Sequence, residues 1–451
     1  MKNSLFILVF IITSYSFGQE HFAGISTSSR VGILNASNNP AELVNMKNTF
    51  EGSLLSTSIN VSNNKVGFKD LFSDTSLETI IFKGNDPVNL RADAEIYGPS
   101  FGFKFKKWAF GITSKIQGKL DIVDVDPKLG DALVNSGLSN LLGSSTSISN
   151  DYNQRMNGTT WGEIGLTTAT NLVNNESYKF SVGATFKLLF PGSYANLGLD
   201  KFNGTITANT LGQVDLRNTT SNLNIAYSGG LANSFSNFND YSKSVFGGLN
   251  GFSGDLGVNF QWKDASTKSN KYKLNTGLSI KNIGSMTFKD ANNNSTNYNL
   301  SIQGSQSLNL NQFENVDNLQ QIETILLNSG FLTKTNSNKD FKVKLPTTLN
   351  LYADVKLISK LYITGFLQQK LNDNNDNDQI TVQNVFTLTP RFTSGIFEIF
   401  APFNSSEISG FTSGVGFRIG GFYLGSSSIV TALLNDSKQG DIYTGFRWGF
   451  L

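Results

Sequence analysis

Apolar residues occupy every second position in several stretches of the chain. The clearest stretch runs from Phe101 to Ile112, where Gly, Lys and Ala separate the apolar positions and Lys106-Lys107 lies in the middle. A period of two is typical of β-strands with one apolar and one polar face, and two residues suffice for a tight hairpin turn. The alternation recurs in 178–188, 349–357 and 442–450. The pattern predicts an all-β chain made of antiparallel hairpins.

Strand length and connection length distinguish a soluble sandwich from a membrane-spanning barrel. Strands of about ten residues with aromatic ends fit an apolar band ~25 Å tall between aromatic girdles. Short and long connections alternate, as periplasmic turns and extracellular loops do in outer-membrane barrels. An extracellular solenoid or adhesin would not require this alternation, and the chain has no repeat of fixed period. We therefore expect a transmembrane antiparallel β-barrel whose terminal residues Phe446, Trp448 and Phe450 contact lipid.

The alternating segments predict fourteen strands. They are 50–62, 92–105, 108–123, 158–173, 177–190, 252–263, 271–283, 344–357, 361–371, 379–391, 395–401, 411–419, 422–430 and 441–451. Residues 204–227 alternate weakly and lack aromatic ends, so we interpret them as an extracellular hairpin; if both of its strands crossed the membrane, the count would be sixteen. Residues 372–378 match a calcium loop poorly and are interpreted as a solvated outer loop.

Two amphipathic stretches, 131–142 and 317–327, predict short helices in extracellular loops. Their apolar faces either cap an apolar entrance or pack on each other.

Composition and the N-terminus limit the location and chemistry of the protein. The 451 residues include 36 Lys+Arg and 34 Asp+Glu, so no basic excess indicates nucleic acid. With no Cys and one His, we expect no metal site, no cofactor and no enzymatic activity. Lys2 followed by the apolar run 5–12 identifies residues 1–18 as a cleaved signal peptide, since the run is too short to span a membrane. Residues 19–48 then form an N-terminal segment, and 49–451 a barrel in the cell outer membrane.

Residues 21–48 do not alternate and contain a turn followed by a helix start. Asn39 is a favourable N-cap, Pro40 fits the first helical position, and Glu42 places a carboxylate near the first-turn amides. The spacing predicts a short helix from Pro40 to about Met46.

The order of several motifs resembles a known family. His21-Phe-Ala-Gly-Ile, Ser29-Arg30-Val31-Gly32 and Asn38-Asn39-Pro40-Ala41 resemble the start of FadL-type outer-membrane transporters. Stretches at 182–189, 278–284, 345–349, 389–391 and 414–417 are similar to a Bacteroidota branch of that FadL-like superfamily, which also contains PorV-like barrels. The resemblance implies that Asn38, Asn39, Pro40 and Ala41 belong to a hatch plugging a fourteen-stranded barrel.

The resemblance also implies a function, for which two interpretations remain. The first is a channel for passive passage of hydrophobic small molecules. The alternative is a non-transporting scaffold or accessory barrel of an envelope or secretion complex. The expected partners are outer-membrane lipid, an apolar solute and an envelope-complex protein.

Two features of the predicted wall have alternative functions. Gly98-Pro99 interrupts the second strand, because proline cannot donate to the ladder; the break either lets an apolar solute leave sideways or is a kink at the extracellular rim. Charged residues on the expected lumen face form a path for a charged solute or pair with one another across a polar interior. They are Lys104, Glu163, Lys179, Lys187, Asp354, Arg418 and Arg447.

Overall fold

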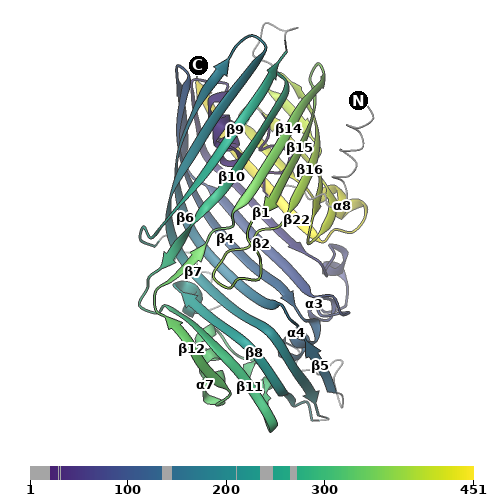
Figure 1. Ribbon diagram of the computed structural model, residues 1–451. Helices are drawn as coiled ribbons and strands as arrows, with labels where there is room; N and C mark the ends of the chain where they lie inside the picture. Colours follow the sequence, from purple (N-terminus) through teal and green to yellow (C-terminus); the bar gives the residue numbers. More distant parts are fainter. Residues whose placement is uncertain are drawn as a thin grey trace, which may run out of the picture.

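The computed structural model describes residues 21–28, 30, 32–134, 145–209, 211–233, 247–264 and 272–450, the last by its backbone alone. The expected signal peptide, residues 1–18, lies outside this range. Figure 1 shows tilted strands that form one tall barrel and continue at one end into a smaller lobe. None of the described helices is long and apolar enough to cross a membrane.

Fourteen strand positions close the barrel, which confirms the predicted count. The ring closes where β1 (Phe50–Asn63) pairs antiparallel with β22 (Gln439–Phe450). Four positions are each shared by two shorter strands, namely β2 with β3, β13 with β14, β17 with β18 and β19 with β20. The remaining wall strands are β2 (Val88–Tyr97), β3 (Ser100–Phe105), β4 (Trp108–Val125), β6 (Asn153–Asn174), β7 (Tyr178–Ala208), β9 (Gly251–Lys263), β10 (Tyr272–Phe288), β13 (Phe341–Lys344), β14 (Thr348–Ile358), β15 (Leu361–Lys370), β16 (Val385–Ser394), β17 (Phe397–Phe400), β18 (Phe403–Ser406), β19 (Gly410–Ser413), β20 (Val415–Ile419) and β21 (Phe422–Ser426).

The two ends of the barrel differ in the length of their connections. At the upper end in Figure 1, short turns such as Lys106-Lys107 and Gly420-Gly421 join the strands. Lys106 and Gly420 have positive φ angles of 55° and 59°, as tight hairpin turns require. We call this the short-turn end and the opposite one the long-loop end. In outer-membrane barrels generally, short turns lie at the periplasmic end and long loops at the extracellular end.

The lobe at the long-loop end continues the barrel wall. β7 is 31 residues long, and its outer part pairs with β5 (Ser145–Ser149) and β8 (Val214–Ser228). β8 pairs in turn with β11 (Asn294–Asn309), and β11 with β12 (Leu332–Asn338). Residues 204–227 therefore belong to a hairpin outside the barrel ring, as predicted. The barrel accordingly has fourteen strands and not the alternative sixteen.

Short helices cover the apolar face of this outer sheet. They are α4 (Pro127–Val134), α5 (Gly230–Asn233), η4 (Leu310–Phe313) and α7 (Leu319–Asn328). Leu129 of α4 and Leu326 of α7 share one buried cluster with Phe202, Ile225 and Leu300 of the sheet. The two amphipathic stretches thus pack into the core of the lobe; α4 begins at Pro127, and residues 135–144 lie outside the described range. The loops at this end also carry η3 (Lys69–Phe72), α3 (Leu77–Ile81) and α8 (Ile429–Leu434).

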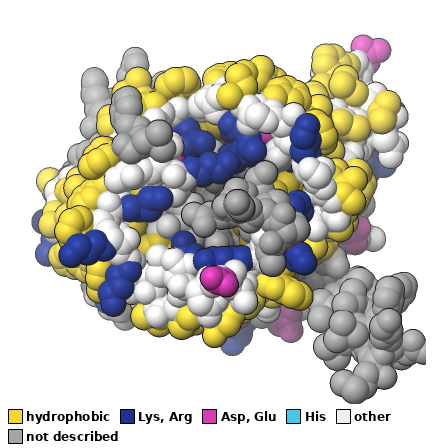
Figure 2. All heavy atoms as spheres, turned by 90° about the horizontal axis from the view of Figure 1, so that it is seen from above, with side chains coloured by type: hydrophobic (Ala, Val, Ile, Leu, Met, Phe, Trp, Pro, Cys, Tyr) yellow, Lys and Arg dark blue, Asp and Glu magenta, His cyan; other side chains and the backbone are white. Residues whose placement is uncertain are grey.

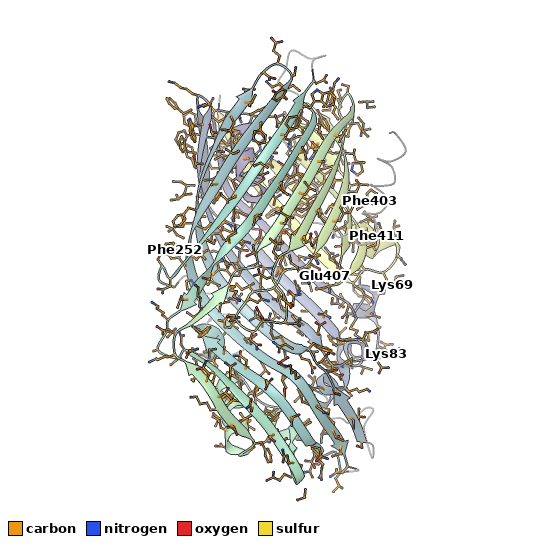
Figure 3. The ribbon with its side chains drawn as sticks, viewed as in Figure 1. Lys69, Lys83, Phe252, Phe403, Glu407 and Phe411 are labelled. Atoms are coloured by element: carbon orange, nitrogen blue, oxygen red, sulfur yellow. The ribbon has the colours of Figure 1, made fainter. Side chains whose placement is uncertain are left out.

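Apolar side chains cover the outside of the wall. Figure 3 shows Phe252, Phe403 and Phe411 pointing away from the barrel. Phe446 and Trp448 are likewise exposed on β22, and the backbone of Phe450 pairs with Phe50. An outward apolar band on a closed barrel is what a lipid environment requires.

The segment between β15 and β16 folds into the barrel, which corrects the predicted strand 379–391. β16 begins at Val385, and residues 379–383 are at most 6% exposed. Ile380 belongs to a buried cluster with Trp161 and Tyr194 of the inner wall. Residues 373, 375, 376 and 378 are exposed, as expected for the predicted solvated loop at 372–378. The loop is attached to the wall where the Tyr194 hydroxyl donates to the backbone oxygen of Asn377 at 2.7 Å.

Candidate functional site

The lumen contains residues 21–28, 30 and 32–47, which we call the N-terminal segment. It comprises α2 (Ile33–Asn38) and the 3₁₀ helix η2 (Pro40–Asn45), drawn in purple inside the barrel in Figure 1. Leu43 is buried with Ala109 of β4 and Ala169 of β6. Phe22 packs against Tyr97 and Tyr443, each with a ring-centroid distance of 5.8 Å. The segment therefore contacts wall strands from β2 to β22.

Asn39 caps η2 as predicted and also binds the wall. Its Oδ1 accepts a hydrogen bond from the Ala41 amide at 3.0 Å, and Pro40 occupies the first position of the helix. Its Nδ2 donates to the Val258 oxygen of β9 at 2.8 Å. Next to it, the backbone oxygen of Asn38 accepts a hydrogen bond from Ser279 at 2.6 Å. One asparagine thus both starts the helix and attaches it to the barrel.

Glu42 is the most extensively bound side chain of the segment. Its Oε1 accepts hydrogen bonds from Asn259 and Asn275, both at 2.9 Å, and from the Tyr352 hydroxyl. Its Oε2 accepts from Asn45 at 2.7 Å. Glu42 is 5% exposed, and a buried carboxylate is stable only when such donors satisfy it. The sequence indicated a helix-terminal role, whereas the structure gives Glu42 a docking role on β9, β10 and β14.

Three glycines of the wall allow Asn39 and Pro40 to approach the strands closely. A Cβ on Gly183 of β7 would lie 2.5 Å from the Pro40 carbonyl carbon, and one on Gly257 of β9 would lie 2.0 Å from Asn39 Oδ1. A Cβ on Gly277 of β10 would lie 2.5 Å from Asn39 Nδ2. Gly183 and Gly257 are partners in the β7–β9 ladder, so they form one flat patch. We call these three residues the glycine seat.

The predicted strand break lies within the wall, not at the extracellular rim. β2 ends at Tyr97 and β3 begins at Ser100, and both strands pair with β1 and β4. The Ser114 hydroxyl donates to the Pro99 oxygen at 3.0 Å. Ser100 and Thr113 line a small gap on the inner side of the break, together with Ile33 and Leu34 of the N-terminal segment.

The predicted lumen charges fall into two groups, and the first is paired in the middle of the barrel. Lys187 contacts Asp255 at 2.8 Å and Glu163 at 3.7 Å, and Glu163 also contacts Lys115 at 3.9 Å. Lys119 contacts Asp93 at 2.9 Å. In the middle of the barrel, oppositely charged side chains therefore pair with one another, which is one of the two interpretations given above.

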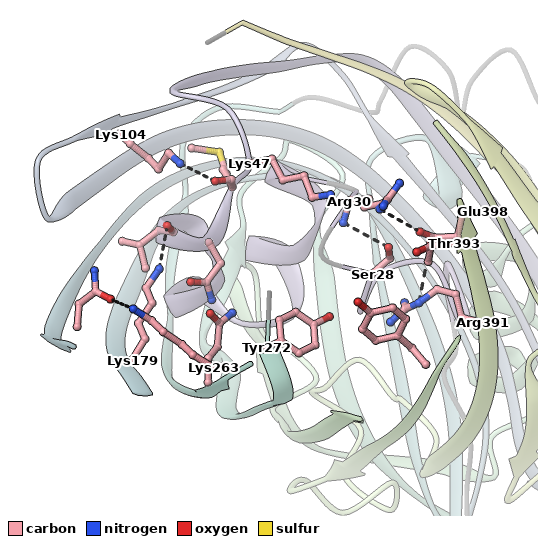
Figure 4. Close-up of a pocket in the computed structure, with 16 residues that line it drawn as sticks. Ser28, Arg30, Lys47, Lys104, Lys179, Lys263, Tyr272, Arg391, Thr393 and Glu398 are labelled. Atoms are coloured by element: carbon pink, nitrogen blue, oxygen red, sulfur yellow. Dashed lines mark hydrogen bonds and ion pairs between the residues drawn. The ribbon is translucent and has the colours of Figure 1, made fainter. Parts of the chain in front are cut away.

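The second group surrounds a cavity of about 440 Å³ between the N-terminal segment and the short-turn end. We call this cavity the chamber (Figure 4). Lys104 donates to the Met46 oxygen at 2.6 Å, and Lys179 to the Val44 oxygen at 3.3 Å. Figure 2 shows Lys and Arg side chains around the hollow at this end. The chamber is therefore bounded by the segment on one side and by basic wall residues on the other.

Three further predicted charges have carboxylate or guanidinium partners near the chamber. Asp354 contacts Arg391 at 2.7 Å. Arg418 contacts Glu398 at 3.7 Å. Arg447 contacts Glu51 at 3.4 Å.

Several residues of the site were missed in the sequence. Asn259, Asn275 and Tyr352 lay within predicted strands and were given no role of their own, and Arg391 belonged only to a family-like motif. The available signal was the amide and hydroxyl content of the inward faces, because small uncharged hydrogen-bonding groups there suit a docked peptide better than open water.

The family model described as "Family of unknown function (DUF5723)" matches residues 40–427 of the chain. The match begins at Pro40 and covers most of the barrel. The chain belongs to this family. A comparison with curated proteins finds no match.

Solved structures similar to this DUF5723 chain are outer-membrane barrels. The Ralstonia pickettii toluene transporter TbuX is 11% identical, with a TM-score of 0.42 over 98% of this chain and 100% of that chain. The P. putida toluene transporter TodX is 8% identical, with a TM-score of 0.43 over 92% and 93%. A Pseudomonas aeruginosa FadL homologue is 8% identical, with a TM-score of 0.39 over 96% and 98%. These structures are FadL-like barrels, the kind of barrel that the sequence resembles.

Proposed function

We propose that the protein is a channel in the outer membrane for hydrophobic small molecules, closed here by the N-terminal segment acting as a hatch. The observation that supports the proposal is the position of Ile33 and Leu34 directly behind the wall break at Gly98-Pro99. A break in the ladder beside apolar side chains offers an apolar solute a sideways exit. Such a solute would then enter the lipid without crossing the charged chamber, where it would have to displace water from lysines.

An apolar cluster at the long-loop end suits the entry side of this route. The rings of Tyr194, Phe288 and Phe341 lie 5.2 to 5.5 Å apart, and Ile380 from the inserted loop packs among them. Clusters of aromatic rings with few polar groups are typical of sites for apolar ligands. In this proposal the loop and the hatch both move before solute passes.

If the N-terminal segment is a hatch, it must be able to detach from the wall while the barrel stays folded. Replacing Asn39 by Ala removes the cap of η2 and should weaken docking by ~0.5–2 kcal/mol. We expect cells carrying Asn39→Ala to differ from wild type in uptake of a labelled long-chain fatty acid or aromatic hydrocarbon, while a gene deletion abolishes it. Equal uptake in all three strains would contradict the proposal.

Closing the wall break tests the exit route. The chain has no native cysteine, so Ser100→Cys with Thr113→Cys introduces one oxidisable pair across the gap. Oxidation should stop uptake, and a reductant should restore it. Phe103→Cys with Phe110→Cys joins the same two strands at a registered pair outside the gap and should leave uptake unchanged. Loss of uptake with both pairs would show that wall flexibility in general, not the gap, is required.

A second candidate is a non-transporting scaffold or accessory barrel. It is favoured by the filling of the lumen from both sides, by the N-terminal segment and by the loop whose Ile380 is fully buried. Its expected result is unchanged uptake in the deletion strain, together with co-purification of a stoichiometric envelope protein.

A further inference from the structure

The chamber has a strong excess of positive charge. Its lining contains six cationic side chains and one carboxylate, that of Glu398. The cations are Arg30, Lys47, Lys104, Lys179, Lys263 and Arg391. Like charges that face one cavity repel each other unless a counter-charge is present.

The lysines of the chamber have neutral partners or none. Lys104 and Lys179 donate to backbone oxygens of the N-terminal segment, and Lys263 donates to Asn174 at 2.7 Å. Lys47 has no hydrogen bond or ion pair within the described part of the chain. In the middle of the barrel, by contrast, Lys187 and Lys119 each contact a carboxylate within 3 Å. The chamber therefore lacks the counter-charges that are present in the middle of the barrel.

Three arginines at the chamber share two carboxylates, which leaves an excess of positive charge. Arg391 contacts Asp354 at 2.7 Å, and the second carboxylate is that of Glu398. Glu398 is the partner of three guanidinium groups, those of Arg30 at 3.9 Å, Arg391 at 4.0 Å and Arg418 at 3.7 Å. Arg391 is 2% exposed, and its Nη1 has no hydrogen-bond partner among the described residues. A buried guanidinium nitrogen without an acceptor is costly. Bound oxyanions are the usual partners of such forks and of nearby lysine ammonium groups.

We propose that the chamber is a binding site for a small oxyanion, a molecule bearing a carboxylate or phosphate group, that arrives from the short-turn side. The cavity of about 440 Å³ lies within the size range of small-molecule sites. The basic rim in Figure 2 would attract an anion to the opening. The site is separate from the apolar route proposed above, because the N-terminal segment lies between them.

The chain's lack of cysteine allows the chamber to be probed one position at a time. In the full-length barrel purified in neutral detergent, Gln261→Cys places a thiol in the chamber lining. Ser177→Cys places one in the exposed turn between β6 and β7. We expect an anionic thiol reagent to react at least about tenfold faster than a cationic one at position 261, and both to react at similar rates at position 177.

Protection measures binding itself. Phosphate, citrate or laurate at millimolar concentration should slow labelling at position 261 more than chloride of equal ionic strength does. Protection by phosphate or citrate indicates a free small oxyanion, and protection by laurate alone indicates the head group of an amphiphile. No protection beyond that of chloride would overturn the proposal.

A charge reversal at Lys47 tests whether the chamber lysines cause the effect. Because Lys47 makes no contact that would be lost, Lys47→Glu changes the lining charge by two without removing a hydrogen bond. It should lower both the reagent preference and the protection several-fold. Lys106→Glu in the exposed β3–β4 turn is the matched control and should change neither. Heat-dependent gel mobility verifies that each barrel is folded. If Lys47→Glu and Lys106→Glu behave alike, the chamber is not the site.

Discussion

The Tyr352 hydroxyl donates a hydrogen bond to the Glu42 carboxylate across 310 residues of chain. Together with Asn259 and Asn275, it makes Glu42 the principal polar anchor of the N-terminal segment. Four donors around one buried carboxylate fix both the position and the rotation of η2. A single substitution at Glu42 therefore removes several contacts between the segment and the wall at once.

Glu42→Gln should loosen the segment. The amide retains one oxygen, but its NH₂ group then faces either the Asn45 donor or the donors of Asn259 and Asn275, so at least one hydrogen bond is lost. Hydrogen bonds to charged groups contribute ~1.5–3 kcal/mol each. We expect faster hydrogen exchange in residues 33–46 of the variant, measured by mass spectrometry, with unchanged exchange in the lobe. Unchanged exchange in the segment would show that its anchor lies elsewhere.

Gly257→Ala should displace the segment, because its Cβ would overlap Asn39. The cap and the Val258 contact cannot both survive that displacement, so we expect a loss comparable to that of Asn39→Ala, ~0.5–2 kcal/mol. The measurement is the same exchange experiment. Gly254→Ala on the same strand is the matched control, since the nearest atom to its Cβ would be 3.7 Å away. Similar behaviour of the two variants would argue against the glycine seat.

Arginine on the outer face should reveal which positions contact lipid. Ile112 is exposed on β4, and its partner on β6, Leu166, is exposed as well. Ile112→Arg should destabilise the folded barrel by ~2–4 kcal/mol, whereas Trp448→Arg near the end of the last strand should cost ~0–1 kcal/mol. Equilibrium unfolding in lipid vesicles measures both values. Equal costs would contradict the assigned depth of these residues.

Acidification should weaken docking of the start of the segment. Burial lowers the pKa of His21 below its ordinary value of 6.5, although Glu95 and Asp93 act in the opposite direction. The undocked ring takes up a proton below about pH 6.5 and the docked ring does so only at lower pH, so stability falls as the pH falls through that range. The thermal midpoint of wild type should drop more between about pH 7.5 and about pH 5 than that of His21→Gln. A midpoint that rises on acidification would reverse the sign of the argument.

Strand number was predictable because the signal is local. The side chains of each wall strand point alternately to the outside and to the lumen. Phe101, Phe110 and Ile112 therefore indicate the outward face without reference to any other strand. The cap at Asn39 was predictable for the same reason, since it depends on residues within two positions. Docking of Glu42 on Asn259, Asn275 and Tyr352 was not, because the partners are 217 to 310 positions away.

The misassigned strand at 379–384 shows the limit of alternation as a signal. Gln379, Ile380 and Thr381 alternate in polarity like a wall strand, yet all three are at most 1% exposed. In the inserted loop, Ile380 packs among aromatic rings of the wall, and its polar neighbours are buried as well. The same sequence pattern therefore serves two environments, and only the neighbouring strands determine which is realised.

The length of β7 has a mechanical consequence. Its 31 residues span about 100 Å at ~3.3 Å per residue, far more than the ~30 Å of hydrocarbon in a bilayer. The pairing of β7 shifts at Gly192 and again near Lys201, whose φ is 54°, so the strand bends where the wall passes into the lobe. A force applied to the lobe would be taken up at these bulges before it reached Gly183, against which the N-terminal segment packs.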